Sequence, residues 1–587
     1  YILFLMSFFQ GQDFIPEYGK NVNYTQLFFR WPQINNSDVY KLNLISNNND
    51  EIYETQHNSI IISNLNWGLE YSWVVCGFSN DLLIDCYEPI FFSINELPEN
   101  YPNNINIISL DELQYTEGLT MLDYDSLDFS VILDSNGNPV WFADKTEFNF
   151  SRIITTQFLP SGNIIGFSPG RGYEFNLDSE ILFETPQEFG LHHQIIKTSN
   201  DTYFFIDAEV QSHPCPIECN SNLPDEIPWQ GDTFIEVDSQ GNVIWEWSTF
   251  DYLSLNEYNP FWVEVYSGNE DFDWTHSNSI FLDEEQDIVY ISIRNLSRIT
   301  AIDYLSKDII WNLGNSNFMD QTFFENDYGF SHQHSAQLSN EGNLLFFDNG
   351  RGNVPEVSRC LEIEFYLDQE PQLVWEHVLP DSLLTYSRGE CDRLNTGNTL
   401  ISCGRTGNVL EVNEENEIVW HLNVKDLDGN DVSIYRSERI QNLYPTFFSF
   451  KVNNLEGIYE NYSFLNNEDI NFTITNNGWS SQIFKYEFYN GNNVLLLEDD
   501  VFVENNNDIN IFENISFNNT ETCLLKVFST NNPDNYQSIE FNIEHIIGDI
   551  NSDFEVNVLD VVALINIILY NEVFNQNSDL NNDNIIN

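Results

Sequence analysis

The sequence predicts an all-β protein in which a six-bladed β-propeller is flanked by two β-sandwich domains and followed by a small α-helical tail. The propeller is predicted by a repeat, because extended apolar runs that end in an aromatic residue recur through the middle of the chain. These residues are Trp141, Phe183, Trp245, Trp311, Trp375 and Trp420. Hairpins of two short strands around a tight turn precede most of them, without helical segments between. Six such units suit four-stranded blades around a channel.

The composition limits the kinds of partner. The chain has 587 residues, which favours several domains. Its 21 Lys+Arg against 92 Asp+Glu give a formal net charge of −71, which would repel a phosphate backbone, so no nucleic-acid partner is expected. Hydrophobic residues at 42% and aromatic residues at 15% are too abundant for a charged disordered chain. The acidic residues are therefore expected on the surface of folded domains.

The N-terminal residues 1–12 are interpreted as the remnant of a secretory signal. Tyr1–Phe9 is apolar and is followed by Gly11 and Gln12. A buried strand is the alternative, and a membrane span would need roughly twenty apolar residues. No later segment is long and apolar enough to span a bilayer, so we expect a secreted protein, extracellular or periplasmic.

The eight cysteines fit an exported protein with a few local disulfides. Cys76 and Cys86 are close in sequence, as are Cys215 and Cys219. A third neighbourhood contains Cys360, Cys391 and Cys403. A zinc site at Cys215 and Cys219 is the alternative, although the spacing has no matching second pair.

Residues 20–97 carry short alternating segments that predict an antiparallel sandwich. The segments are LFFRW (27–31), YKLNLI (40–45), SIIIS (59–63) and YSWVVCGF (71–78). Trp31 and the stretch from Gly68 to Val74 resemble a fibronectin type III domain. The propeller is expected over 108–445, with loop insertions at 211–230 and 251–273. Residues 446–545 return to alternating strands and predict an immunoglobulin-like sandwich.

The last segment, 547–587, predicts a calcium-binding loop and a helix. Oxygen-bearing side chains occupy loop positions 1, 3, 5, 7, 9 and 12, a spacing that wraps Ca²⁺. They are Asp549, Asn551, Asp553, Glu555, Asn557 and Asp560. The pattern restarts at Asp579, so the tail resembles a type I dockerin that is truncated in its second half, which implies a cohesin-like or cell-surface partner. An Asn/Asp turn without a ligand is the alternative.

Several of the ten histidines fall at one place in the repeat. His193, His334 and Gly389 each lie eight residues before a hairpin turn, and His276 starts the same strand of its own repeat. Because the first strand of each blade lines the channel, the three histidines are expected to converge there. Clustered imidazoles can bind a metal, or they can handle an oxyanion with one ring as nucleophile or acid–base. Arg351, just past the second strand of the His334 repeat, favours the anion.

The propeller resembles the bacterial aryl-sulfate sulfotransferases. The resemblance covers about residues 110 to 445 and rests on five motifs. They are HHQII (192–196), DWTHSNSI (273–280), HQHSAQLSNEGNLLFFDNGRG (332–352), RLNTGNTLISCGRTGNVLEVNEENEIVW (393–420) and YRSERI (435–440). The family is exported and moves sulfate between phenols by a ping-pong mechanism through a sulfohistidine, without a nucleotide donor.

The resemblance implies roles for individual residues. His276 and His334 would bind the sulfuryl group or transfer protons, beside Arg351 and with His193 close by. The covalent histidine of the family would lie where this chain has Gly389. The sequence therefore predicts an exported aryl-sulfate sulfotransferase that uses a phenolic sulfate and a phenol acceptor without a catalytic cofactor. The alternative is a non-catalytic extracellular ligand-binding or adhesion protein on the same propeller.

Overall fold

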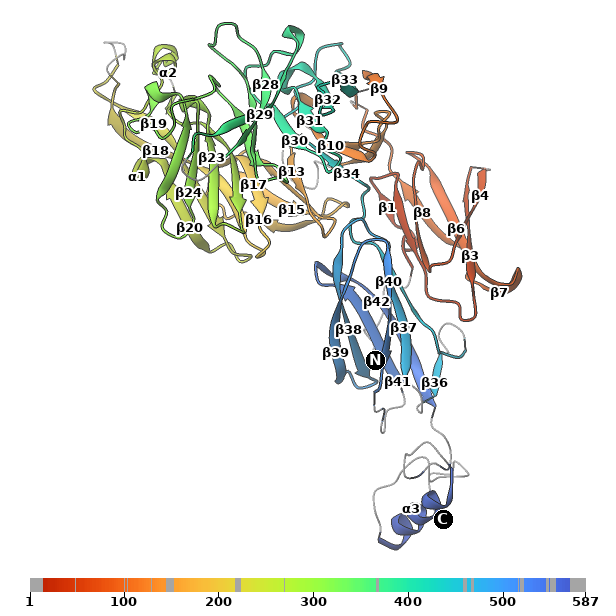
Figure 1. Ribbon diagram of the computed structural model, residues 1–587. Coiled ribbons are helices and arrows are strands. Elements are labelled where there is room, and N and C mark those ends of the chain that lie inside the picture. The colour runs from red at the N-terminus through yellow and green to blue at the C-terminus, as the bar shows by residue number, and fades with distance from the viewer. Residues whose placement is uncertain are drawn as a thin grey trace, which may run out of the picture. The chain divides into compact units, whose positions relative to one another are not determined.

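A computed structural model of the protein describes residues 14–570, and the gaps in that range are 48, 100, 103, 128, 144–151, 217–222, 269, 366–368, 458–461, 466–468, 516, 518–521, 545–547, 549 and 551–555. The chain divides into two compact units, one of residues 97–442 and one of the residues on either side of that range. Strands make up most of the structured residues in both units (Figure 1). The predicted all-β class is confirmed.

The described strands of residues 97–442 pair into six mostly antiparallel sheets. The first contains β10 (Leu119–Tyr124), β11 (Phe129–Leu133), β12 (Pro139–Phe142) and β34 (Ser437–Ile440), and the second β13 (Ile154–Phe158), β14 (Ile164–Ser168), β15 (Arg171–Phe175) and β16 (Ile181–Glu184). The third contains β17 (Leu191–Lys197), β18 (Tyr203–Pro214), β19 (Glu226–Val237), β20 (Val243–Ser248) and β21 (Phe272–Asp273).

The fourth sheet contains β22 (Ser277–Asp283), β23 (Ile288–Ile293), β24 (Arg298–Asp303) and β25 (Ile309–Gly314). The fifth contains β26 (His334–Leu338), β27 (Leu344–Asp348), β28 (Arg359–Glu364) and β29 (Gln372–Val378). The sixth contains β30 (Glu390–Arg393), β31 (Thr399–Ser402), β32 (Asn408–Val412), β33 (Ile418–Lys425) and β9 (Asn104–Leu110). Because β9 pairs with β33, residues 104–107 belong to this sheet, although the sequence placed the start of the propeller at 108.

The hairpins predicted from the sequence are the first two strands of these sheets. Gly162, Gly342 and Gly397 occupy their turns with φ of 88°, 80° and 90°, a left-handed conformation that glycine adopts without a steric penalty. Asp201 takes the same role between β17 and β18 with φ of 61°. Turn chemistry that acts over a few residues therefore marks the hairpin in four of the six sheets.

Three of the recurring tryptophans donate a hydrogen bond to the following sheet. The indole Nε1 of Trp141 donates to Leu177 O at 2.8 Å, and that of Trp245 donates to Tyr304 O at 2.8 Å. Trp420, in the sixth sheet, donates to Ser135 O in the first sheet at 2.9 Å. The sixth sheet also contacts the first through β31 and β34. The sixth sheet therefore contacts the first, and the sequence of contacts between sheets is closed. Strand β34, at the end of this unit, pairs with β10 and completes the first sheet.

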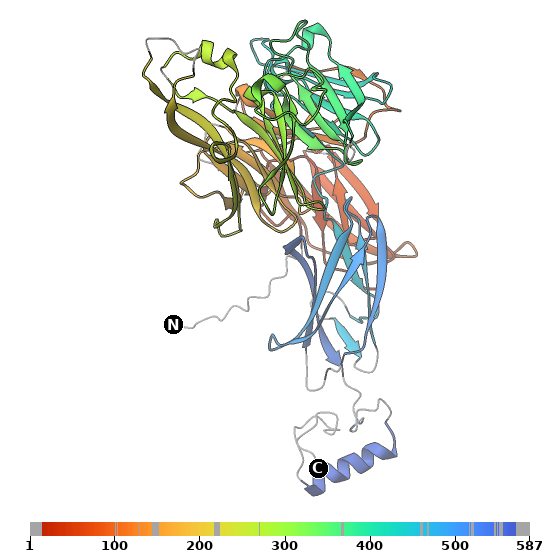
Figure 2. The same cartoon turned by 60° about the vertical axis from the view of Figure 1, so that its left-hand side comes forward.

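The two predicted insertions lie in and beside the third sheet. Strands β18 and β19 extend as a long ribbon through much of 211–230. The segment 251–273 contains part of α1 (Thr249–Tyr252), all of α2 (Pro260–Val265) and β21, which pairs with β19. Figure 1 and Figure 2 show α2 near the end of the β18–β19 ribbon from two sides. The described residues also include the 3₁₀ turns η1 (Asp125–Leu127), η2 (Arg294–Leu296), η3 (Ser316–Phe318), η4 (Asp381–Leu383) and η5 (Gly404–Thr406).

The other unit contains two pairs of sheets. The N-terminal strands are β1 (Asn21–Val22), β2 (Leu27–Arg30), β3 (Val39–Ser46), β4 (Asn49–Thr55), β5 (Ser59–Ile62), β6 (Glu70–Ser79), β7 (Leu82–Cys86) and β8 (Ile90–Ile94). They form one sheet ordered β1-β8-β6-β3-β4, with β7 beside β6, and a second of β2 and β5. Trp31 and Trp73 are buried in the core of this segment.

The later strands of this unit form sheets of three and five strands. They are β35 (Phe448–Val452), β36 (Ser463–Leu465), β37 (Ile470–Asn476), β38 (Gln482–Asn490), β39 (Leu495–Val503), β40 (Asn507–Glu513), β41 (Thr522–Ser529) and β42 (Asn532–Glu544). Buried phenylalanines, among them Phe472 and Phe488, fill the core of these strands. Helix α3 (Val558–Tyr570) follows.

Two disulfides are present among the described residues. Cys76–Cys86 confirms a predicted local pair, and Cys360 pairs with Cys391, which leaves the nearby Cys403 as a buried free thiol. Cys215 is disulfide-bonded, and Cys219 lies outside the described residues. Across the described part of the chain, no helix has both the length and the apolarity that a membrane crossing requires.

Candidate functional site

The predicted histidines lie where the first strands of three sheets depart from regular pairing. In β17, His192 pairs with Ile206 and Ile195 with Phe205, so His193 and Gln194 form a bulge. In β26 the register shifts between His334 and Gln337. A β-bulge redirects side chains that a regular ladder would hold on alternate faces. His193 and His276 also have φ of 63° and 49°, which few residues other than glycine adopt.

The structure brings the three predicted histidines together. The ring centres of His193 and His276 are 4.7 Å apart. His334 and His193 both contact the ring of Tyr435, with centroid separations of 5.1 and 6.3 Å. His192 lies beside His193, with 2.6 Å between their Nδ1 atoms. The first strands of successive sheets therefore meet in one histidine cluster, which also includes His332.

Each ring of the cluster has a different set of partners. His276 Nδ1 lies 2.6 Å from Asp273 Oδ2. His192 Nε2 lies 3.2 Å from Asp232 Oδ1. His334 Nδ1 lies 3.0 Å from the carbonyl oxygen of Gly389, the residue at the fourth equivalent position.

Arg351, predicted from its place after β27, lies beside this cluster within a cage of aromatic rings. Its guanidinium carbon is 5.0 Å from the ring centre of Phe261, 5.2 Å from that of Trp262 and 5.8 Å from that of Tyr386. Phe261 and Trp262 belong to α2, and both rings also contact His332. The inserted segment therefore covers the site with aromatic surface, which suits a cation or an arene.

Sequence reasoning missed Arg294 and Tyr435. Arg294 follows β23 as Arg351 follows β27, so its place in the repeat was an available signal. Its guanidinium is buried and lies 5.1 Å from the ring centre of Trp262. Tyr435 belongs to the YRSERI motif, but the motif assigned no role to it. Its ring joins His193 and His334.

Burial, and after it the charge of nearby arginines, sets the electrostatics of the cluster. Burial and then the charges of Arg294 and Arg351 lower the pKa of His332 to about 3. Burial and then Arg436 and Arg294 hold the pKa of His334 well below its ordinary value. Burial also lowers the pKa of Arg294 to about 10, with Asp273 acting in the opposite direction. Neutral imidazoles next to buried guanidinium groups favour an anionic ligand.

Two buried polar atoms point to a missing partner. His332 is 4% exposed and Tyr435 is 6% exposed. Among the described residues, His332 Nε2 and Tyr435 Oη have no hydrogen-bond partner. A buried polar atom without a partner is costly, and the explanation is often a bound ligand or water. A ligand with several oxygens would satisfy the tyrosine hydroxyl and pair with the arginines.

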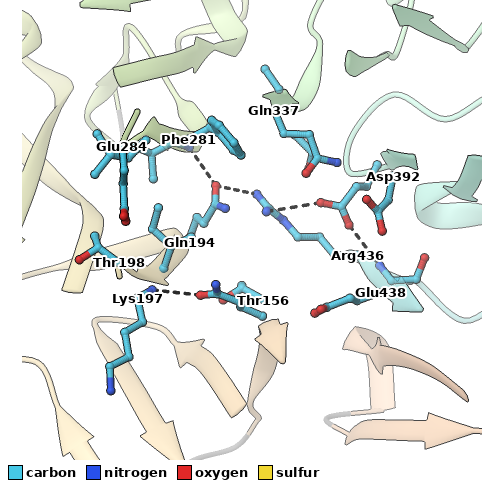
Figure 3. Close-up of a pocket in the computed structure, with 18 residues that line it drawn as sticks. Thr156, Gln194, Lys197, Thr198, Phe281, Glu284, Gln337, Asp392, Arg436 and Glu438 are labelled. Carbon is cyan, nitrogen blue, oxygen red and sulfur yellow. Dashed lines mark hydrogen bonds and ion pairs between the residues drawn. The ribbon is translucent and has the colours of Figure 1, made fainter. Parts of the chain in front are cut away.

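A pocket of about 330 Å³ lies next to the histidine cluster, because its lining includes Gln194 and Ser335, which follow His193 and His334 in the sequence. Figure 3 shows Gln194 and Arg436 among its lining residues. Its lining comes from β13, β17, β22, β26, β30 and β34, one strand of each of the six sheets. Arg436 reaches across it and donates to Gln194 Oε1 at 3.1 Å and to Asn278 O at 3.0 Å. It also lies 3.5 Å from Glu390 Oε1. Arg436 is therefore close both to the histidine cluster, where its charge acts on His334, and to a carboxylate of the pocket.

Carboxylates line the far side of this pocket. Burial and then the neighbouring Glu390 raise the pKa of Asp392 to about 7. Burial and then Asp392 raise the pKa of Glu438 to about 8. We call Glu390, Asp392 and Glu438 the acidic pocket, and it would repel an anion once these carboxyl groups are ionised.

The predicted calcium ligands are only partly described. Asp549, Asn551, Asp553 and Glu555 lie outside the described residues, as does the repeat at Asp579. Asp560 accepts hydrogen bonds from the backbone N–H groups of Ile550 and Asn557, both at 2.7 Å. Elsewhere in the described structure, no group of three or more His, Cys, Asp or Glu side chains is arranged to hold a metal ion.

Part of the sequence also matches a family model. Residues 98–373 match the family model described as arylsulfotransferase (ASST), which supports the resemblance drawn from the motifs. No curated protein matches the chain. Solved structures that it resembles include a luciferin-regenerating enzyme, with 10% identity and a TM-score of 0.28 over 56% of this chain and 99% of that one.

Two further structures have similar scores. Kluyveromyces lactis Hsv2 has 9% identity and a TM-score of 0.26 over 73% of this chain and 99% of that one. Apo AztD from Citrobacter koseri has 10% identity and a TM-score of 0.25 over 81% of this chain and 98% of that one. At these TM-scores the likenesses decide nothing about this chain.

Proposed function

We propose that residues 97–442 form a six-bladed propeller that transfers a sulfuryl group from a phenolic sulfate to a phenol. The observation that carries this proposal is the histidine cluster beside Arg294 and Arg351, with two buried polar atoms that lack partners. The arylsulfotransferase match over residues 98–373 supports the same chemistry. The six sheets and the contact between the sixth and the first support a closed propeller.

The guanidinium groups of Arg294 and Arg351 favour a sulfuryl group bound in the histidine cluster. Arg351 has no hydrogen bond or ion pair from its guanidinium to another described side chain, and its contacts are aromatic rings. A sulfate ester offers it oxygens for charge-assisted hydrogen bonds and offers the rings of α2 an aryl group to pack against. In this proposal Arg294 and Arg351 hold the sulfuryl oxygens, and the neutral rings of His193 and His334 border the reacting group.

Transfer to a phenol acceptor is the direct test. The full chain is given 4-nitrophenyl sulfate with and without phenol, and release of nitrophenol is compared for wild type, His334→Ala and Arg351→Ala. We expect acceptor-dependent release that falls by about 100-fold or more in each variant, as for the loss of a group that stabilises transition-state charge. Arg171→Ala, a change on β15, is the matched control and should retain activity. No release at any concentration of wild type would refute transferase function and leave the ligand-binding alternative.

Export and calcium binding belong to the same proposal. The two disulfides support folding in an oxidising compartment, so we place the protein outside the cytoplasm. The tail would bind Ca²⁺ through Asp549, Asn551, Asp553, Glu555, Asn557 and Asp560, and would attach to a cohesin-like or cell-surface partner. Calorimetry with Ca²⁺ should detect binding that Asp549→Ala with Asp553→Ala abolishes. Absence of heat from the wild-type chain would refute this site.

A further inference from the structure

The histidine cluster has to supply a nucleophile that the resemblance places at position 389. Gly389 has φ of 102°, and a Cβ at this position would lie 2.7 Å from the ring of Phe347. Another ring must therefore accept the sulfuryl group if the proposed function holds. When a neutral imidazole nitrogen bonds to sulfur, the ring loses that lone pair and becomes cationic. The acceptor thus needs a free nitrogen, a nearby carboxylate and access for the substrate.

His192 and His193 do not meet these requirements. Both nitrogens of His192 face other side chains, since Nε2 lies 3.2 Å from Asp232 Oδ1 and Nδ1 lies 2.6 Å from His193 Nδ1. His193 is surrounded by other imidazoles, and burial followed by the charges of His276 and His192 holds its pKa well below the ordinary value. A positive charge on this ring would face Arg294 as well.

His332 and His334 also lack a balancing carboxylate. His332 faces Arg294 and Arg351, and its Nδ1 contacts Ser331 Oγ at 2.8 Å. His334 is 2% exposed, faces Arg436 and Arg294, and has its Nδ1 3.0 Å from Gly389 O. In both rings, a new cationic charge would be placed against guanidinium groups.

His276 meets all three requirements. Its Nδ1 lies 2.6 Å from Asp273 Oδ2, and the side chains of His276 and Asp273 are 31% and 34% exposed. Among the described residues, no hydrogen bond to His276 Nε2 is found, so that lone pair is free. We propose that His276 Nε2 is the sulfuryl acceptor of this chain and that Asp273 is its positioning residue. This inference rests on the proposed function.

The step conserves atoms and charge. The Nε2 lone pair attacks the sulfur of the aryl sulfate, the sulfur–oxygen bond to the aryl group breaks, and the phenolate leaves and takes a proton from solvent. Asp273 faces the Nδ1–H of the resulting cationic ring, and its negative charge offsets the new positive charge. A second phenol, which gives its proton to solvent, attacks the same sulfur, and the N–S bond breaks to restore His276.

A covalent adduct on His276 is the direct test. The full chain is mixed with 4-nitrophenyl sulfate without acceptor, quenched, digested and mapped by mass spectrometry. We expect a gain of one SO₃ group on His276, and addition of phenol before the quench should remove it. His276→Ala and His276→Gln should lose transfer by about three orders of magnitude or more, whereas His57→Gln, in the other unit, should not. Asp273→Asn should lower kcat while KM stays within about twofold.

The outcomes separate this inference from the proposed function. Transfer with an adduct on His193, His332 or His334 overturns the assignment of His276 and leaves the transferase. Transfer that survives in both His276 variants likewise overturns the assignment of His276 and leaves the transferase. No transfer and no adduct in wild type overturns both. An Asp273→Asn variant with unchanged kcat overturns the positioning role alone.

Discussion

The histidine cluster and the acidic pocket lie along the same inner strands, yet arginines gather at the first and carboxyl groups at the second. On β26, His334 faces buried arginines, whereas Gln337, three residues later, lines the pocket that contains Asp392 and Glu438. The cluster concentrates cationic groups in a chain whose net charge is −71. Arg436 lies between the two regions and interacts with both. Local placement, and not net charge, thus decides which ligand each region attracts.

Removal of the buried guanidinium of Arg294 should have the largest effect on activity, because it acts on the histidine cluster and not on the acidic pocket. Arg294→Ala should lower kcat/KM for 4-nitrophenyl sulfate by about 100- to 1000-fold, because Arg294 acts on His193, His332 and His334 together. Steady-state kinetics would measure this. Arg171→Ala is the control, and an Arg294→Ala enzyme within twofold of wild type would remove Arg294 from the site.

The position that the resemblance assigns to the nucleophile should not accept a histidine. Gly389→His adds a Cβ against the ring of Phe347 at positive φ, so we expect a loss of about 2 to 4 kcal/mol in the free energy of unfolding. Urea unfolding would measure it. Gly342→His shares a positive φ of 80° but has open space around it, so it should cost less. Equal losses in the two variants would show that the contact with Phe347 is unimportant.

The acidic pocket should make stability depend on pH. Folding raises the pKa of Asp392 from an ordinary value of 3.8 to about 7, so ionisation disfavours the folded state. The cost is absent below about pH 4 and complete above about pH 7, which means that stability falls as pH rises through this window. Asp392→Asn should reduce that fall, by several degrees of Tm in thermal unfolding. Glu415→Gln, at an exposed position, is the control and should leave the profile unchanged.

Binding of free sulfate should give the smallest effect, a shift in Tm. Sulfate that binds the histidine end should raise the Tm of wild type by about 2 to 4 °C more than chloride at equal ionic strength. Because sulfate also stabilises proteins by exclusion from their surface, the informative quantity is the difference from Arg351→Ala. The same rise in both proteins would argue against an anion site at Arg351.

Much of the fold follows from local sequence. Turn residues such as Gly342 and Gly397 mark the hairpins, and Cys76 and Cys86 are ten residues apart, so strand pairing brings them together. The convergence of His193, His276 and His334 could be expected from their equal place in the repeat. Arg294 was missed because it belongs to no quoted motif, although it follows β23 as Arg351 follows β27. Tyr435 lies in a quoted motif, yet only the fold shows that its ring touches two histidines.

The sequence by itself determined the strands, their turns and the histidines that gather, because alternation, turn chemistry and repeat position act over a few residues. It also contained the pair of Asp273 and His276, which are three residues apart. Only the tertiary structure decided that His334 faces Arg436 and that Asp392 lies beside Glu438. These neighbours are far apart along the chain and meet because β34 returns to the first sheet. Charge interactions fall off with distance and strengthen with burial, so they depend on this closure, which no local pattern encodes.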